Sequence, residues 1–140
     1  QELYDTLLKQ MHASRVDYSG FFRHLAELQL ADPAQDDALR NLFVERDAFD
    51  RWAMDYRARL HGEGSQDAQR RKRMNGVNPL YVLRNYLAQQ AIERAQQKDF
   101  SEIDRLLKLL AAPFDEVPGM ARYAAPPPDW GRQILVSCSC

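Results

Sequence analysis

The sequence predicts an all-α fold, an irregular bundle of about six or seven helices that ends in an extended, proline-rich C-terminal arm. Apolar residues recur at three- and four-residue spacing through residues 1–112, which favours helices and no sheet of three or more strands. Prolines gather after residue 112, where they remove backbone donors. We therefore expect a helical domain, residues 1–112, and a tail, residues 113–140, ending in Cys-x-Cys, together forming one domain.

The composition is typical of a globular domain, with 140 residues, 45% hydrophobic and 28% charged. A net charge of -1 argues against the whole chain binding nucleic acid or an acidic membrane. No apolar run approaches the roughly 18 residues of a membrane span and no signal peptide is visible, so the expected location is cytoplasmic. Only two cysteines occur, which excludes a secreted disulfide framework.

In the N-terminal part of the chain, apolar residues recur at helical spacing in two sets, which predict two short helices. The first set is Leu3, Leu7, Leu8 and Met11, and the second is Tyr18, Phe21, Phe22, Leu25 and Leu28. Asp32-Pro33 is a cap followed by proline, which predicts another helix start. A longer helix follows, and its aromatic face is expected to be core: Phe49, Trp52, Ala53, Tyr56 and Leu60.

Two glycines in residues 61–66, HGEGSQ, predict a loop. The run Arg70-Arg71-Lys72-Arg73 that follows is the strongest cluster of like charge. No aromatic residues are interleaved with it. We favour a solvated helix face, or a basic surface facing another domain, over a nucleic-acid site.

The central helix is expected from Pro79 to about Gln97, because Asn78 can cap its first turn and proline suits its first position. Its apolar stripe is broad enough to contact several neighbours: Leu80, Leu83, Leu87, Ala88, Ala91, Ile92 and Ala95.

Arg84 lies within this apolar arc and Asn85 at its edge, so they form the candidate structural polar pair. An unpaired buried guanidinium is costly, so Arg84 needs a partner. We favour a structural ion pair with Asp47, Asp50 or Asp55, or a backbone carbonyl, over contact with a substrate.

The last regular helix is expected near residues 98–111, with Ser101 as its cap and one apolar face of Ile103, Leu106, Leu107 and Leu110. Five prolines in residues 113–129 predict an extended run over the surface, anchored by Tyr123 and Trp130. Residues 133–137 are expected to form a short strand or an extended arm.

The common nucleotide-binding and catalytic motifs are absent from the sequence: no GxGxxG, GxxxxGK[ST], GxSxG, HRD, DFG or HExxH occurs. The three histidines fall in different predicted elements, and paired carboxylates such as Asp36-Asp37 have no converging nucleophile. We therefore assign no catalytic, cofactor-binding or metal-binding residue in this chain. Asn78-Pro79-Leu80-Tyr81 matches an NPxY docking signal and residues 126–128 a polyproline surface, but helix capping and tail packing are the favoured interpretations.

Three strings carry a resemblance to a known family: MNGVNPLYVLRNYLAQQAIERA, DFSEIDRLLKLLAAPFDE and PPPDWGRQILVSCSC. In order and spacing, residues 75–140 resemble the C-terminal region of the selenoprotein O family, and FFRHLAEL and FDRWAMDYRARL fit the region before it. Members of this family have a pseudokinase fold and act as protein adenylyltransferases.

The resemblance implies that the chain is the C-terminal domain of a longer protein that transfers AMP from ATP to hydroxyl side chains of other proteins. ATP and magnesium would bind a kinase-like domain upstream of Gln1, whose motifs cannot be placed on this sequence. The expected partners are that upstream domain and the protein substrates, with no nucleic acid and no membrane.

The family's redox residue, two positions from the C-terminus, corresponds to Cys138. The resemblance implies a disulfide from it to the kinase-like domain. Cys140 stands where serine is expected, which leaves open which thiol is the redox partner. Cys138 and Cys140 should not favour each other, because side chains one residue apart tend to diverge in an extended segment.

Two classes of function remain: a helical structural and regulatory domain of an adenylyltransferase, or a free-standing helical module that binds other proteins without catalysis. The family strings and the terminal cysteine support the first, and only the lack of catalytic motifs supports the second. A chain that opens on Gln1 rather than methionine is expected to be a fragment of a longer protein.

Overall fold

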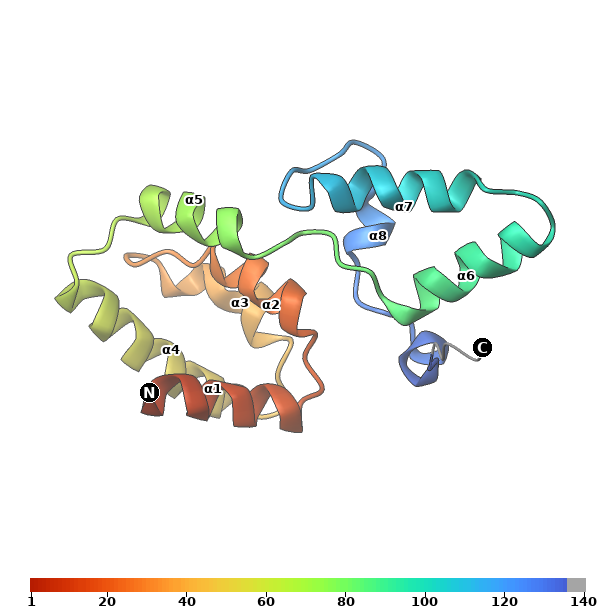
Figure 1. The fold of residues 1–140 in the computed structure, drawn as a ribbon. Coiled ribbons are helices and arrows are strands. Elements are labelled where there is room, and N and C mark those ends of the chain that lie inside the picture. Colours follow the sequence, from red (N-terminus) through yellow and green to blue (C-terminus); the bar gives the residue numbers. More distant parts are fainter. Residues whose placement is uncertain (136–140) are drawn as a thin grey trace. The chain divides into compact units, whose positions relative to one another are not determined.

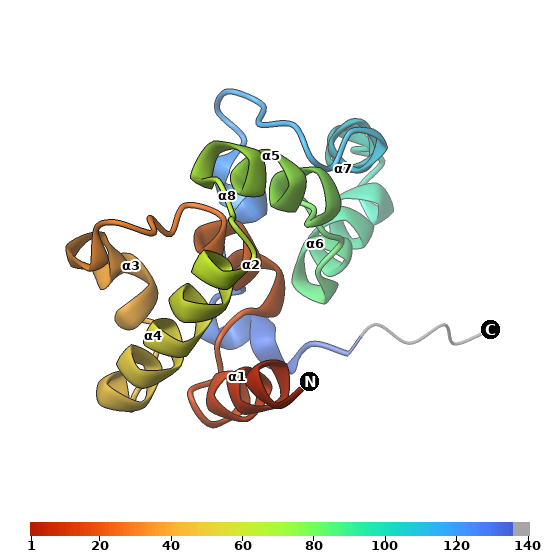
Figure 2. The same ribbon diagram turned by 90° about the vertical axis from the view of Figure 1, so that its left-hand side faces the viewer.

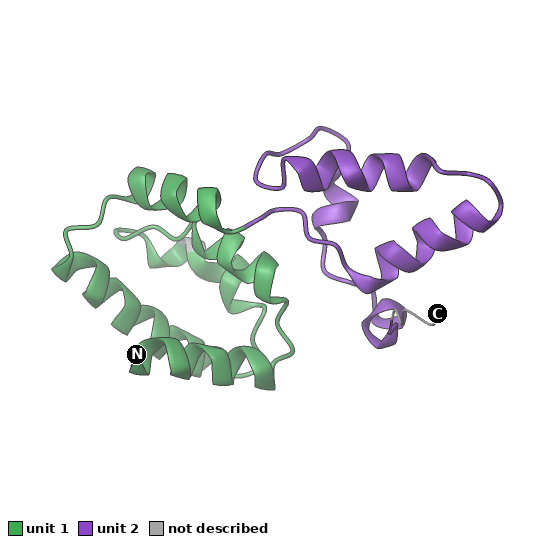
Figure 3. Cartoon of the chain, in the orientation of Figure 1, with its two compact units in different colours: residues 1–78 green, residues 79–140 purple. Residues whose placement is uncertain are grey.

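A computed structural model describes residues 1–135, apart from the side chain of Gln35. The described residues form eight α-helices and two 3-10 helices, with no strand among them, which confirms the predicted all-α class (Figure 1). The chain divides into two compact units, the first from Gln1 to Asn78 and the second beginning at Pro79 (Figure 3). Each unit has its own hydrophobic core.

The first unit contains five α-helices and one 3-10 helix. They are α1 (Glu2–Ala13), α2 (Tyr18–Leu25), η1 (Pro33–Asp36), α3 (Asp37–Arg40), α4 (Arg46–Gly62) and α5 (Asp67–Val77). Two starts follow directly from side-chain caps, because Asp17 accepts a hydrogen bond from the amide of Gly20 at 2.9 Å and Asp32 from that of Ala34 at 3.1 Å. The predicted helix start at Asp32-Pro33 is therefore confirmed.

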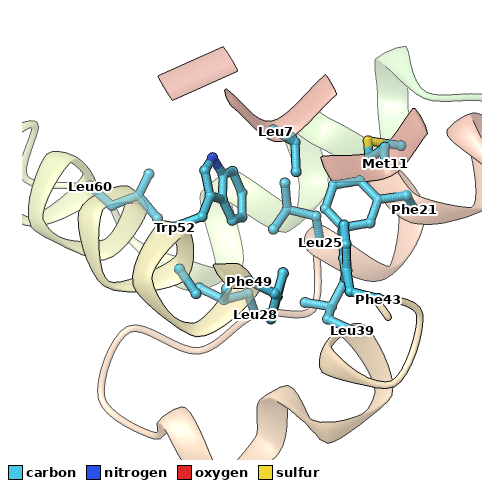
Figure 4. Packing of buried hydrophobic residues seen from close by; sticks show 11 residues of the cluster. Leu7, Met11, Phe21, Leu25, Leu28, Leu39, Phe43, Phe49, Trp52 and Leu60 are labelled. Atoms are coloured by element: carbon cyan, nitrogen blue, oxygen red, sulfur yellow. The ribbon is translucent and has the colours of Figure 1, made fainter. Parts of the chain in front are cut away.

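The core of the first unit lies between α1, α2, α3 and α4, and α1 packs along α4 (Figure 2). The predicted aromatic face of α4 is confirmed, since Phe49, Trp52 and Leu60 are buried (Figure 4). The rings of Phe43 and Phe49 stack with centroids 4.8 Å apart. The indole of Trp52 also donates to the carbonyl of Leu3 at 2.9 Å, so α4 is fixed to α1 by a hydrogen bond as well as by packing.

The second unit contains α6 (Asn85–Gln96), α7 (Ser101–Ala111), α8 (Ala121–Ala124) and the 3-10 helix η2 (Asp129–Gln133). Helices α6 and α7 pack against each other, and η2 contacts α6. The core of this unit is formed by Tyr81, Tyr86, Leu87, Ala91, Leu106, Leu109 and Tyr123. Residues 113–135, predicted to run extended, include α8 and η2, so that prediction is wrong for these two segments.

The predicted start of the central helix is wrong. Asn78 is the C-cap of α5, where its side-chain amide donates to the carbonyl of Met74 at 2.8 Å. Residues 79–84 are not helical, because the amides of Leu80 and Tyr81 donate to the carbonyl of Pro113 instead. The hydroxyl of buried Tyr81 accepts from the amide of Val117 at 3.0 Å. These contacts between distant segments replace the first turn that the local pattern predicted.

The apolar faces of α6 and α7 are also narrower than predicted. Leu83, which precedes α6, is 57% exposed, Ile92 on α6 is 41% exposed and Leu107 on α7 is 62% exposed. In α7 the buried face consists of Glu102, Leu106 and Leu109. The expected cap Ser101 is instead the first helical residue, and its amide donates to the carboxylate of Asp99 at 3.0 Å.

Candidate functional site: buried charge networks in each unit

Arg57 is one of two buried arginines among the described residues of the first unit, and it lies on α4, the helix that carries the aromatic face. Its two terminal nitrogens each donate to one oxygen of Asp36 at 2.7 Å, and its Nε donates to the carbonyl of Gln29 at 3.1 Å. Both side chains of this ion pair are 10% exposed. The bidentate geometry therefore fixes the segment between α2 and α3 to α4.

Arg70 holds the same segment from α5. Its side chain is 2% exposed, pairs with Asp67 at 2.8 Å and donates to the carbonyl of Leu28. Asp67 in turn accepts from the amide of Leu30 at 3.3 Å. The backbone of residues 28–30 is thus bound by side chains from two helices, which satisfies groups that a buried loop would otherwise leave unpaired.

Glu102 is the centre of the polar network in the second unit, with only 4% of its surface exposed. It accepts hydrogen bonds from Arg105, from Arg122 at 3.1 Å and from the hydroxyl of Tyr123 at 2.8 Å. A third arginine, Arg94, lies 3.6 Å away. These contacts bind α7 to α8 and to the end of α6, so the proline-rich segment is part of the folded unit.

The network also constrains Tyr123 and its neighbours. The Tyr123 hydroxyl accepts from Arg105 at 3.2 Å and from Arg122, whose guanidinium lies over the Tyr123 ring, 4.3 Å from its centroid. The hydrogen bond with Tyr123, and to a smaller degree the negative charge of Glu102, raises the pKa of Arg105 above its ordinary value. Hydrogen bonding to Ser101 lowers the pKa of Asp99. Both shifts favour the charged forms of Arg105 and Asp99.

The candidate pair Arg84 and Asn85 lies at the start of α6 rather than within an apolar arc. Arg84 is the N-cap residue and is partly buried, and its carbonyl accepts from the amides of Leu87 and Ala88. Asn85 is exposed and donates to the carbonyl of Ile134 at 3.0 Å, which links the tail to α6. Of the expected partners of Arg84, Asp47 and Asp50 pair with Arg40.

Other sequence predictions have mixed outcomes. In the basic run, Arg70 is buried, contrary to a fully solvated face, whereas the following residues are exposed and Arg71 pairs with Glu27 at 2.8 Å. Tyr123 is buried as expected, but Trp130 is 58% exposed and packs edge-to-face on Tyr86. Cys138 and Cys140 lie outside the described residues.

Sequence reasoning missed Arg57 and Glu102, although a signal for each was present. Arg57 lies four residues after Ala53 and eight after Phe49, within the stripe that was predicted to be core. Glu102 precedes Leu106 by four residues and Leu109 by seven. A charged residue inside an otherwise apolar helical stripe indicates a buried ion pair. This reasoning, applied above to Arg84, also fits Arg57 and Glu102.

Within residues 1–135, no group of three or more His, Cys, Asp and Glu side chains could hold a metal ion. His12, His24 and His61 are exposed on α1, α2 and α4. No helix in the described part of the chain combines the length and apolarity needed to cross a bilayer.

Comparison with known proteins identifies the family to which the chain belongs. The family model described as protein adenylyltransferase SelO matches residues 1–111, and the chain belongs to this family. The chain is 55% identical to the protein nucleotidyltransferase YdiU of Pseudomonas paraeruginosa (strain PA7), covering 99% of this chain and 28% of that protein.

Proteins of the same name in Burkholderia ambifaria (strain MC40-6) and Herminiimonas arsenicoxydans are 54% and 52% identical to this chain. The alignments cover 99% of this chain in both, and 26% and 28% of those proteins. The chain thus spans little more than a quarter of the length of these relatives. The predicted family is confirmed.

Proposed function

We propose that this chain is the C-terminal helical, structural and regulatory domain of a protein adenylyltransferase, which transfers AMP from ATP to hydroxyl side chains of proteins. The observation that carries the proposal is the alignment over 99% of the chain with relatives named protein nucleotidyltransferase, of which it spans 26–28%. ATP and magnesium would bind a kinase-like domain outside the chain, and the proposal keeps the expected cytoplasmic location.

The charge networks support a structural part in this function. Arg57 and Arg70 fix the segment between α2 and α3, and Glu102 fixes α8 to α7. Each network joins segments within one unit. The regulatory part rests on Cys138, which the family resemblance assigns to a disulfide with the kinase-like domain.

The test uses the full-length protein that contains this chain. It is incubated with magnesium and ATP labelled at the α-phosphate, after reduction or mild oxidation, and label transferred to protein is counted. We expect AMP transfer that depends on the redox state, and we expect Cys138→Ser to abolish this dependence while Cys140→Ser keeps it. Absence of labelled protein would refute the enzymatic part, and an unchanged redox response in Cys138→Ser would refute the regulatory part.

A further inference from the structure

The arginines around Glu102 carry more positive charge than that carboxylate requires. Glu102 is already satisfied by Arg105, Arg122 and Tyr123, so Arg94, at 3.6 Å, adds charge without a hydrogen bond. Asp99, 3.8 Å from Arg94, is the second carboxylate beside the cluster, and it also accepts the amide of Ser101. Three guanidinium groups thus face two carboxylates, and one positive charge is in excess.

The outer sides of these guanidinium groups remain available. Half of the Arg94 side chain is exposed, as are 36% of that of Arg105 and 57% of that of Arg122. The Nε and Nη2 of Arg105, and the Nε and Nη1 of Arg122, donate to no acceptor within residues 1–135. Planar donors of this kind match the oxygens of a phosphoryl group.

The cluster is also held in place before any ligand arrives. Arg105 and Arg122 both donate to the same Tyr123 hydroxyl and to the same oxygen of Glu102, which keeps the two guanidinium groups close together. Stacking on the Tyr123 ring further fixes Arg122. Little side-chain freedom is then lost on binding an anion, which favours affinity.

We propose that Arg94, Arg105 and Arg122 form a surface site for a dianionic phosphoryl group, with Glu102 and Tyr123 as the groups that position the arginines. The site lies at the junction of α6, α7 and α8. Its ligands would be free phosphate or the phosphate of a small nucleotide.

The experiment titrates the 140-residue chain with inorganic phosphate at constant ionic strength, set with sodium chloride, and follows the guanidinium resonances by nuclear magnetic resonance. We expect saturable shifts at Arg94, Arg105 and Arg122. A parallel titration with AMP distinguishes the sources: equal affinity indicates recognition of the phosphate alone, and tighter binding of AMP at the same arginines indicates a nucleotide. Binding of AMP without binding of phosphate would overturn the proposal.

Three variants sharpen the test. Arg94→Gln removes charge without breaking a hydrogen bond of Glu102, and should weaken phosphate binding about tenfold, as expected for a lost charged contact. Asp99→Asn keeps an acceptor for Ser101 but removes a negative charge, so it should tighten binding. Arg51→Gln, on exposed α4 surface of the first unit, is the control of equal charge change and should leave affinity unaltered.

Equal weakening in Arg94→Gln and Arg51→Gln would show a response to overall charge and refute the site. Unchanged affinity in Arg94→Gln would do the same. Thermal melting separates a loss of binding from a loss of folding: Arg94→Gln and Arg51→Gln are expected to match the parent chain, and Asp99→Asn to melt slightly lower because its charge stabilises the folded state.

Discussion

The two units bury charge in different ways. The core of the first unit includes Phe21, Phe43, Phe49 and Trp52. Beside it, the buried Arg57 and Arg70 donate hydrogen bonds to backbone carbonyls of the loop between α2 and α3. In the second unit the core is smaller, and one buried carboxylate, that of Glu102, contacts arginines from three helices. The first unit therefore depends more on apolar packing, and the second more on polar contacts that bind its tail.

The largest effect is expected at Phe49, which is fully buried in the first unit. Phe49→Ala should lower the free energy of unfolding by about 4 kcal/mol, because both the apolar contacts and the filled volume are lost. Urea denaturation measures this, with amide hydrogen exchange read separately for residues 1–78 and for the residues after 78. Val44→Ala, at a side chain 76% exposed, is the control and should change stability little.

The next effect concerns the buried ion pair. Arg57→Ala leaves the carboxylate of Asp36 buried without its partner, which should cost about 3 kcal/mol. Arg59→Ala, on the same helix, breaks an exposed pair with the C-cap residue Glu63 and should cost less than about 1 kcal/mol. Similar losses in both variants, measured by chemical denaturation, would contradict the view that burial makes the Arg57 pair important.

In the second unit, Glu102→Gln keeps the shape of the side chain but removes its charge. It should cost about 2 kcal/mol, because arginine donors then meet a neutral amide and one oxygen acceptor is lost. Hydrogen exchange should increase in α7 and α8. A loss of hydrogen-exchange protection in α1 and α4, but not in α7 and α8, would contradict the assignment of Glu102 to the second unit.

The contrast between the units also explains what the sequence could predict. The helices of residues 1–62 follow periodicity and local caps, such as Asp32 before Pro33, and these are properties of neighbouring residues. The error at Asn78 has a different origin, because its side chain caps the preceding helix and the next residues bond to Pro113. A local pattern cannot show that a carbonyl 33 residues further along the chain is the acceptor of the Leu80 amide.

The buried polar groups were predictable in kind but not in place. The cost of an unpaired charge correctly predicts that an arginine in an apolar stripe needs a partner, and Arg57 meets that need. Arg84 lies just before its helix, because the helix starts later than its cap signal indicated. The network of Glu102 could not be predicted, since it depends on how Arg122 and Tyr123 in the tail return to α7.

The smallest predicted effect is a pH dependence at the start of α7. The pKa of Asp99 is lowered, first by hydrogen bonding to Ser101 and to a smaller degree by Arg94 and Arg105, so its charged form stabilises the folded state. This contribution is fully present above the unfolded pKa, near 3.8, and is lost as the pH falls through the lower folded value.

The melting midpoint of the chain should therefore decline more steeply below about pH 4 than that of Asp99→Asn, which keeps a hydrogen-bond acceptor but does not titrate. Above pH 5 the difference between the two midpoints should be constant. The effect is expected to be small because Asp99 is exposed and solvent screens its interactions. Parallel melting curves of the two proteins from pH 2 to pH 6 would show that the cap at α7 depends on the hydrogen bond and not on charge.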